Sequence, residues 1–186
     1  MIEDFVFFNS EVSIPISIEY PINLEERATK DKVDKYVNGR SNYGISWEHN
    51  GSKIVLKDSS GSIKGFPSTD LNFIITIHHG SESKYQPPNN AVIYNLDGTV
   101  YKVLDMPELL SPIITKRLKY LSLPNPPIKW STNEGGLKFD GFMWKRNKSG
   151  ELVDAISILF DREIWESRIL NVKLGKIGEC LDYGIA

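Results

Sequence analysis

The feature that most constrains the fold is the segment from Ala91 to Leu104, in which two runs rich in β-branched and aromatic residues flank Asp97-Gly98. Glycine adopts a positive φ at no steric cost, and Asp-Gly is typical of tight turns whose twist matches that of paired strands. The segment therefore predicts a β-hairpin. Similar turn signals occur at uneven spacing at Asn50-Gly51, Ser60-Gly61, Ser149-Gly150 and Leu174-Gly175. This pattern indicates a series of hairpins rather than a regular propeller or solenoid.

Several other segments are predicted as strands from their residue patterns. Residues 11–22 alternate between apolar and polar side chains, which is typical of a half-buried strand, and Pro15 favours an edge position. Residues 71–78 are more apolar and indicate a central strand that is buried on both faces. The remaining predicted strands are 45–49, 53–57, 62–66, 128–131, 136–144, 151–160 and 164–172.

Two segments are predicted as helices. Residues 23–37 are charged, Asn23 and Glu26 resemble a capping box, and Asn38-Gly39 supplies a stop, although a charged loop stays open as the alternative. Residues 105–121 carry two helix-start signals and predict a helix that is broken or restarted at Pro112. The proline-rich residues 123–127 cannot continue this helix and predict a stiff connector.

Together these patterns predict a mainly β fold, of the β-rich α+β type. Because strands joined by hairpins pair with their sequence neighbours, we expect an antiparallel meander that is curled or split into two packed sheets, with one or two short helices. The 186 residues suit a single domain over 1–186, and the connector at 123–127 is the candidate internal boundary.

The composition constrains the binding partners and the cellular compartment that we expect for the chain. The formal net charge of -2 provides no global positive field for nucleic acid or an anionic membrane. The single cysteine, Cys180, excludes an intramolecular disulfide and favours a reducing compartment. The first five residues contain two acids and no basic residue, unlike a signal peptide, and no apolar run approaches the ~18 residues of a membrane span. We therefore expect a cytoplasmic protein that binds neither membrane nor nucleic acid.

No residue is assigned a catalytic, cofactor-binding or metal-binding role. His78 and His79 are adjacent on a predicted strand and so point to opposite faces, which favours a structural role over a shared metal ion. Cys180 has no local nucleophile signature, and the chain contains neither a Gly-x-Ser-x-Gly elbow nor a phosphate loop. We expect no cofactor. Whether the chain is an enzyme stays open, with a non-enzymatic role favoured.

A group of carboxylates surrounds Trp165, namely Asp161, Glu163 and Glu166. Strand alternation places Asp161 and Glu163 on one face and Glu166 on the other. Three interpretations stay open: the solvated side of a strand, which is favoured, a glycosidase-like carboxylate pair, and an acidic docking surface for a basic partner.

Two further groups of residues have a structural and a functional interpretation. Residues 116–120 combine three cations with an aromatic residue on the predicted helix, and a solvated helix face is favoured over contact with nucleic acid. Four tryptophans fall in predicted strands, where most aromatics are expected in the core and a subset could form a sugar-binding platform. They are Trp47, Trp130, Trp144 and Trp165.

One resemblance is carried by residues 90–98, which precede a Leu/Pro segment at 104–107, and by Trp165-Glu166-Ser167-Arg168 before a glycine turn. These stretches resemble β-rich uncharacterised bacterial proteins of the kind encoded beside polymorphic or contact-dependent toxins. The resemblance covers a minor part of the chain and transfers no functional residue. It implies a small bacterial immunity protein that binds and blocks a cognate toxin.

The leading functional hypothesis is therefore a binding protein of the immunity type. Its partner would be a protein, with a basic nuclease-type toxin domain as the first candidate, and Asp161, Glu163 and Glu166 are the candidate docking residues. The alternatives are a carboxylate-dependent carbohydrate-active enzyme and a carbohydrate-binding β domain that uses exposed tryptophans. The sequence assigns no oligomeric state.

Overall fold

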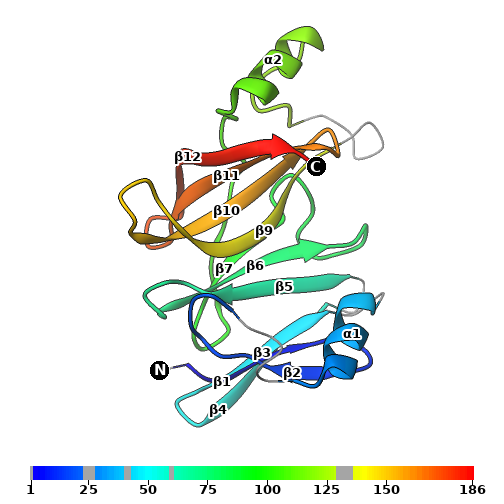
Figure 1. Cartoon of the computed structure of the whole chain (residues 1–186), viewed down its shortest axis with the longest axis vertical. Coiled ribbons are helices and arrows are strands. Elements are labelled where there is room, and N and C mark those ends of the chain that lie inside the picture. Colours follow the sequence, from blue (N-terminus) through cyan, green and yellow to red (C-terminus); the bar gives the residue numbers. More distant parts are fainter. Residues whose placement is uncertain (1, 23–27, 40–42, 59–60, 129–135) are drawn as a thin grey trace.

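The computed structural model describes residues 2–22, 28–39, 43–58, 61–128 and 136–186. Within these ranges, twelve strands form three four-stranded antiparallel sheets, accompanied by two short helices. Figure 1 shows the sheets as three stacked layers, with the N-terminal sheet at the bottom and the C-terminal sheet below helix α2 at the top. The expected mainly β class, built from antiparallel hairpins with short helices, is confirmed.

Each sheet takes most of its strands from one continuous part of the chain. The N-terminal sheet has the order β2 (Ser13–Pro15), β1 (Glu3–Phe8), β3 (Gly44–His49) and β4 (Ser52–Leu56). The middle sheet has the order β5 (Ser62–Pro67), β6 (Phe73–His79), β7 (Ala91–Asn95) and β8 (Val100–Val103). The C-terminal sheet has the order β12 (Lys176–Ile185), β11 (Ile164–Asn171), β10 (Leu152–Phe160) and β9 (Leu137–Arg146). The helices are α1 (Lys30–Asn38) and α2 (Pro112–Tyr120).

The middle sheet is buried on both faces. Along β6, Ile75 and Ile77 belong to a core shared with the C-terminal sheet, whereas Ile74 belongs to a second core shared with the N-terminal sheet. Successive side chains of a strand point to opposite faces, so a strand between two cores is apolar at nearly every position. The predicted central strand at residues 71–78 is confirmed.

The predicted hairpin at Asp97-Gly98 joins β7 and β8 and is confirmed. Gly98 has a φ of 83°, and its N–H donates to the carbonyl of Asn95 at 3.0 Å. The Asp97 carboxylate accepts the N–H of Thr99 at 3.0 Å. A Cβ at Gly98 would lie 2.8 Å from a methyl carbon of Ile54 in β4, so glycine also allows the hairpin to approach the N-terminal sheet.

The strands form three sheets, whereas the sequence predicts one curled sheet or two packed sheets. The difference comes from β1, a segment for which no strand is predicted from the sequence. In the structure Phe5 is buried in the core, and β1 pairs with both β2 and β3. This pairing gives β3 and β4 a sheet of their own instead of extending the middle sheet.

Helix α1 begins later than predicted. It starts at Lys30, and Thr29 is its N-cap, whose side chain accepts the N–H of Lys32. The predicted capping box of Asn23 and Glu26 lies outside the described residues. The predicted stop is confirmed, because the helix ends at Asn38 and Gly39 is its C-cap.

Two predicted strands differ from the structure or are not described. Of residues 11–22 only Ser13–Pro15 pair, as β2, and the expected edge position of Pro15 is confirmed. The alternation of this segment continues past the point where the chain leaves the sheet, which explains the longer prediction. Residues 129–131 of the predicted strand 128–131 lie outside the described residues.

Candidate functional site

Residues 105–111, which link β8 to α2, form neither helix nor strand and lie outside the three sheets. We call this segment the strap. The sequence predicts a helix over 105–121 with a break or restart at Pro112, and the helix begins only there, capped by the Ser111 hydroxyl, which accepts the N–H of Ile114 at 3.2 Å. Met106 and Leu109 hold the strap against the core. A buried backbone without a strand partner needs other hydrogen-bond partners.

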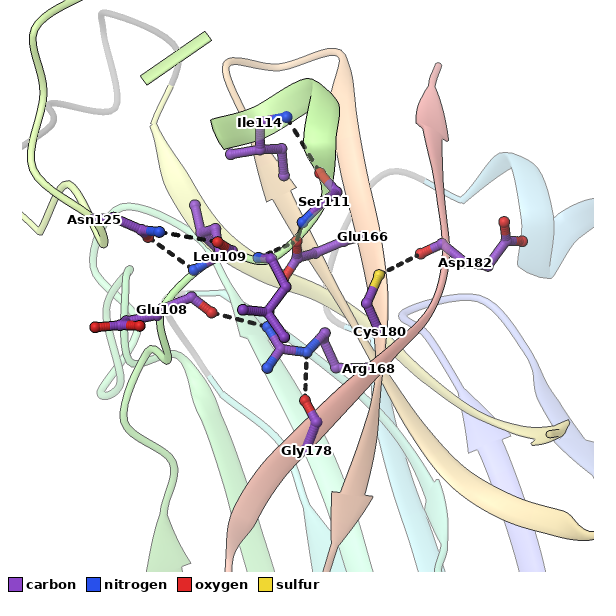
Figure 2. A network of polar contacts seen from close by, with 11 residues as sticks. Glu108, Leu109, Ser111, Ile114, Asn125, Glu166, Arg168, Gly178, Cys180 and Asp182 are labelled. Carbon is purple, nitrogen blue, oxygen red and sulfur yellow. Dashed lines mark hydrogen bonds and ion pairs between the residues drawn. The ribbon is translucent and has the colours of Figure 1, made fainter. Parts of the chain in front are cut away.

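A buried ion pair on β11 supplies these partners, as Figure 2 shows. Arg168 Nη1 lies 2.7 Å from Glu166 Oε1, and the two side chains are 4% and 0% exposed. Glu166 Oε2 accepts the N–H groups of Leu110 at 2.9 Å and Ser111 at 2.8 Å. Arg168 Nη1 also donates to the carbonyl of Glu108 at 2.8 Å. The pair satisfies the backbone of the strap, and this offsets the cost of burying two charges.

Asn125, which follows α2 in the sequence, attaches the chain after the helix to the strap before it. Its amide donates to the carbonyl of Leu109 at 2.9 Å and accepts the N–H of Leu109 at 2.8 Å. Asn125 belongs to the connector 123–127, so the segment that the sequence marks as a candidate boundary is bonded to the strap. Between the two anchors, α2 buries Ile114 and Leu118 in the core that joins the middle and C-terminal sheets. The helix is therefore fixed on both sides.

A groove of about 420 Å³ lies between α2 and the ends of β11 and β12. Its lining residues are Ile113, Lys116, Arg117, Tyr120, Ile164 and Ile185. We call it the α2 groove. Tyr120 is 80% exposed and Ile185 is 65% exposed. Large apolar side chains that are exposed side by side are typical of interaction surfaces.

The helix side of the α2 groove is positively charged. Lys116, Arg117 and Lys119 are exposed on α2, and the helix contains no carboxylate. Arg117 Nε donates to Asp161 Oδ2 at 2.8 Å, and its guanidinium lies 5.8 Å from the ring centroid of Tyr120. Arg117 is thus held in place between the helix and the β10–β11 turn.

The structure places the three predicted docking carboxylates in different surroundings. Asp161 has a φ of 53°, lies in the β10–β11 turn and pairs with Arg117. Glu163 is exposed just before β11, next to Ile164 of the α2 groove. Glu166 is wholly buried, and both of its carboxylate oxygens accept hydrogen bonds from groups of the chain itself, Oε2 from the N–H of Leu110 and Oε1 from Arg168. The expected common face of Asp161 and Glu163 does not apply, because neither residue belongs to a strand.

The sequence does not predict the groove residues Tyr120, Ile113, Ile164 and Ile185 as a site. The basic and aromatic cluster 116–120 is the available signal, and its pattern favours a solvated helix face. The missing information is the position of Ile164 and Ile185, which pair across β11 and β12 and reach α2 only in the folded chain.

The adjacent histidines lie at the end of β6, where strand alternation sends them to opposite faces. His78 is 3% exposed and packs its ring against those of Tyr85 and Tyr94. Burial lowers the pKa of His78 to about 4. Burial, together with the charges of Lys138 and Lys64, lowers the pKa of His79 to about 4. Both rings are therefore neutral at pH 7.

We expect the free energy of unfolding to fall as the pH drops from 7 to 5, by about 2 kcal/mol for each histidine. The pKa of both groups is lower in the folded chain than in the unfolded chain, so their contribution is complete above pH 6.5 and is lost toward pH 4. Asp154 opposes this trend by about 1 kcal/mol, because burial raises its pKa to about 6. NMR titration of the imidazole protons provides the test, with the urea-unfolded chain as the control, in which both rings titrate near pH 6.5. Midpoints above pH 6 in the folded chain would contradict the assignment.

Cys180 and the three tryptophans that the structure describes contribute to the fold rather than to a surface site. Cys180 is half-buried, and burial, followed by the charge of Glu166, raises the pKa of its thiol, the opposite of what a nucleophile needs. Trp47 is buried, and its indole N–H donates to the carbonyl of Leu96 at 2.8 Å, which confirms its expected place in the core. Trp144 donates to the carbonyl of Pro67 at 2.7 Å, and Trp165 is half-buried. Trp130 lies outside the described residues.

Comparisons of the chain with protein-family models, with curated proteins and with solved structures give no match. Within the described ranges, no helix is both long and apolar enough to cross a membrane. In the same part of the chain, no three histidine, cysteine, aspartate or glutamate residues gather closely enough to hold a metal ion.

Proposed function

We propose that the chain is a protein-binding protein and that its partner docks on the α2 groove. The observation that carries this proposal is the exposure of Tyr120 and Ile185 on a surface that is otherwise rigidly held. Aromatic and aliphatic anchors that lose water on binding supply most of the free energy of protein association. The strap, the buried ion pair and Asn125 fix α2 before binding, so little conformational entropy is lost in docking.

The charge of α2 specifies the kind of partner. The exposed Lys116 lines the groove and Lys119 is exposed on the same helix, while Asp161 pairs with Arg117. An acidic surface with an apolar protrusion complements this arrangement, since opposite charges steer association and apolar contact then retains the partner. The sequence favours a basic partner that would bind to the three carboxylates Asp161, Glu163 and Glu166. With Glu166 buried, only Glu163 among them is both exposed and outside an ion pair that the structure records.

The specific form of the proposal is an immunity protein. The resemblance to proteins encoded beside toxins supports this form, and the α2 groove gives it a docking surface. The bound toxin would present an acidic and apolar patch to α2. A carbohydrate-active site is less well supported, because both carboxylate oxygens of Glu166 are bonded within the chain itself. Oε2 accepts the backbone N–H groups of Leu110 and Ser111, and Oε1 forms the ion pair with Arg168.

The test is co-expression with the product of the neighbouring open reading frame, followed by co-purification. Ile185→Asp places a charge among the apolar side chains of the groove and is expected to weaken the complex about 100-fold, since it also repels an acidic partner. Val37→Asp is the matched control, because Val37 is 63% exposed on α1 and lies away from the groove. The proposal fails if no complex with this product forms, or if the two variants bind equally.

A further inference from the structure

A second cavity lies where the middle and C-terminal sheets end beside each other. This cleft has a volume of about 610 Å³. It is bounded by the end of β6, the loop over residues 80–90, the start of β9 and the β10–β11 turn. A volume of this size is typical of small-molecule sites, which are mostly preformed. Among the residues that the structure describes, none lines both the cleft and the α2 groove.

The walls of the cleft are held by their own hydrogen bonds. Asn90 is 1% exposed, accepts the N–H of Phe139 at 2.9 Å and donates to the carbonyl of Phe139 at 2.9 Å. Gln86 donates to the carbonyl of Gly80 at 3.3 Å and to the carbonyl of Ser83 at 2.5 Å. The Asn90 bonds attach the end of the loop 80–90 to β9 of the C-terminal sheet, and the Gln86 bonds hold the loop together internally. The cleft is therefore part of the folded framework.

The charge of the lining is positive. Lys138 and Arg162 line the cleft, and its described lining includes no carboxylate. Asp140 lies outside the lining and holds Lys138, with its Oδ1 2.9 Å from Lys138 Nζ. A cavity lined by charges of one sign attracts small ions of the opposite sign.

His79 adds a polar group that the fold leaves unsatisfied. Its Nε2 is buried and has no hydrogen-bond partner in the structure. A buried polar atom without a partner carries a desolvation cost, and in native proteins such atoms often belong to binding sites. The neutral imidazole offers one N–H donor and one acceptor nitrogen.

We propose that this cleft binds a small organic anion. Its carboxylate or phosphate would lie at Lys138 and Arg162, and its apolar body would contact Leu137, Leu159 and Pro87. The His79 ring lies in the same lining and offers a hydrogen-bonding group to the bound molecule. This site is separate from the α2 groove and does not depend on the partner protein.

The test is an NMR titration of the full chain with phenylacetate and phenylphosphate, with phenylacetamide as the uncharged analogue. The proposal expects saturable shifts at His79 and Lys138 with at least one anion and much weaker binding of phenylacetamide. Lys138→Gln is expected to weaken anion binding about tenfold, since it removes one charge-assisted contact. Arg162→Gln is the second variant, in case the loss of the Lys138–Asp140 pair disturbs the fold.

Lys145→Gln on β9 is the matched control, because Lys145 lies outside the lining. Equal binding of phenylacetamide, or shifts confined to the α2 groove, would overturn the proposal. The absence of any saturable shift with either anion would also overturn it. Unchanged affinity for the anion in both Lys138→Gln and Arg162→Gln would show that neither cation contacts the anion, and it would overturn the proposed site. The anion that binds more tightly identifies the headgroup, carboxylate or phosphate.

Discussion

Replacing Arg168 with methionine is expected to lower the free energy of unfolding by about 3–5 kcal/mol. The variant leaves the Glu166 carboxylate wholly buried without its cation. It also leaves the carbonyl of Glu108 without the donor that Arg168 provides. An uncompensated buried charge costs far more than the pair itself contributes, so the effect exceeds that of an ordinary core substitution.

Urea unfolding of matched variants measures this effect. Glu163→Gln is the control, because Glu163 is exposed, and its change is expected within about 0.5 kcal/mol. The double variant Glu166→Gln/Arg168→Met is expected to be more stable than Arg168→Met alone, since no unpaired charge remains and the amide oxygen of the introduced glutamine can still accept the backbone N–H of Ser111. A loss below about 1 kcal/mol in Arg168→Met would show that the pair does not anchor the strap.

The second large effect is expected at Asn90, for which alanine should cost about 2–4 kcal/mol. The side chain of Asn90 donates to the carbonyls of His78 and Phe139 and accepts the N–H of Phe139, each at 2.9 Å. The substitution leaves these buried backbone groups without that partner. Because Phe139 lies in β9 and His78 in β6, the variant loosens the contact between two sheets rather than one turn.

The control for Asn90 is Asn95→Ala. Asn95 is half-buried and donates to Thr99 at 3.0 Å in a solvent-exposed hydrogen bond, so water can replace this bond and the cost is expected below about 1 kcal/mol. Hydrogen exchange adds a readout specific to the proposed role, because the amide of Phe139 should lose protection in Asn90→Ala. Equal stability of the two variants would contradict the assigned bridge between the sheets.

Local patterns in the sequence account for much of the fold. The hairpin at Asp97-Gly98 and the central strand over 71–78 depend on turn chemistry and on runs of apolar residues, which are visible within a few positions. The third sheet depends on β1, a segment that is not predicted as a strand. Its pairing with β3 spans about forty residues and cannot be inferred from a local pattern.

The candidate site is harder to predict for a physical reason. Charged residues are rarely buried, so the sequence favours a surface position for Glu166, and only the strap explains why it is inside. Helix-start signals before Pro112 predict a helix over residues 105–111, although this segment forms neither helix nor strand in the structure. The cluster 116–120 is visible in the sequence, but its neighbours Ile164 and Ile185 are brought to it by β11 and β12.

The most direct test of docking on the α2 groove is amide hydrogen exchange of the chain with and without the product of the neighbouring open reading frame. Binding at the groove predicts slower exchange over α2 and over the end of β12, residues 183–185, with unchanged exchange in α1. Protection that appears elsewhere, on the N-terminal sheet or α1, while α2 exchanges as in the free chain, would contradict the proposed docking site.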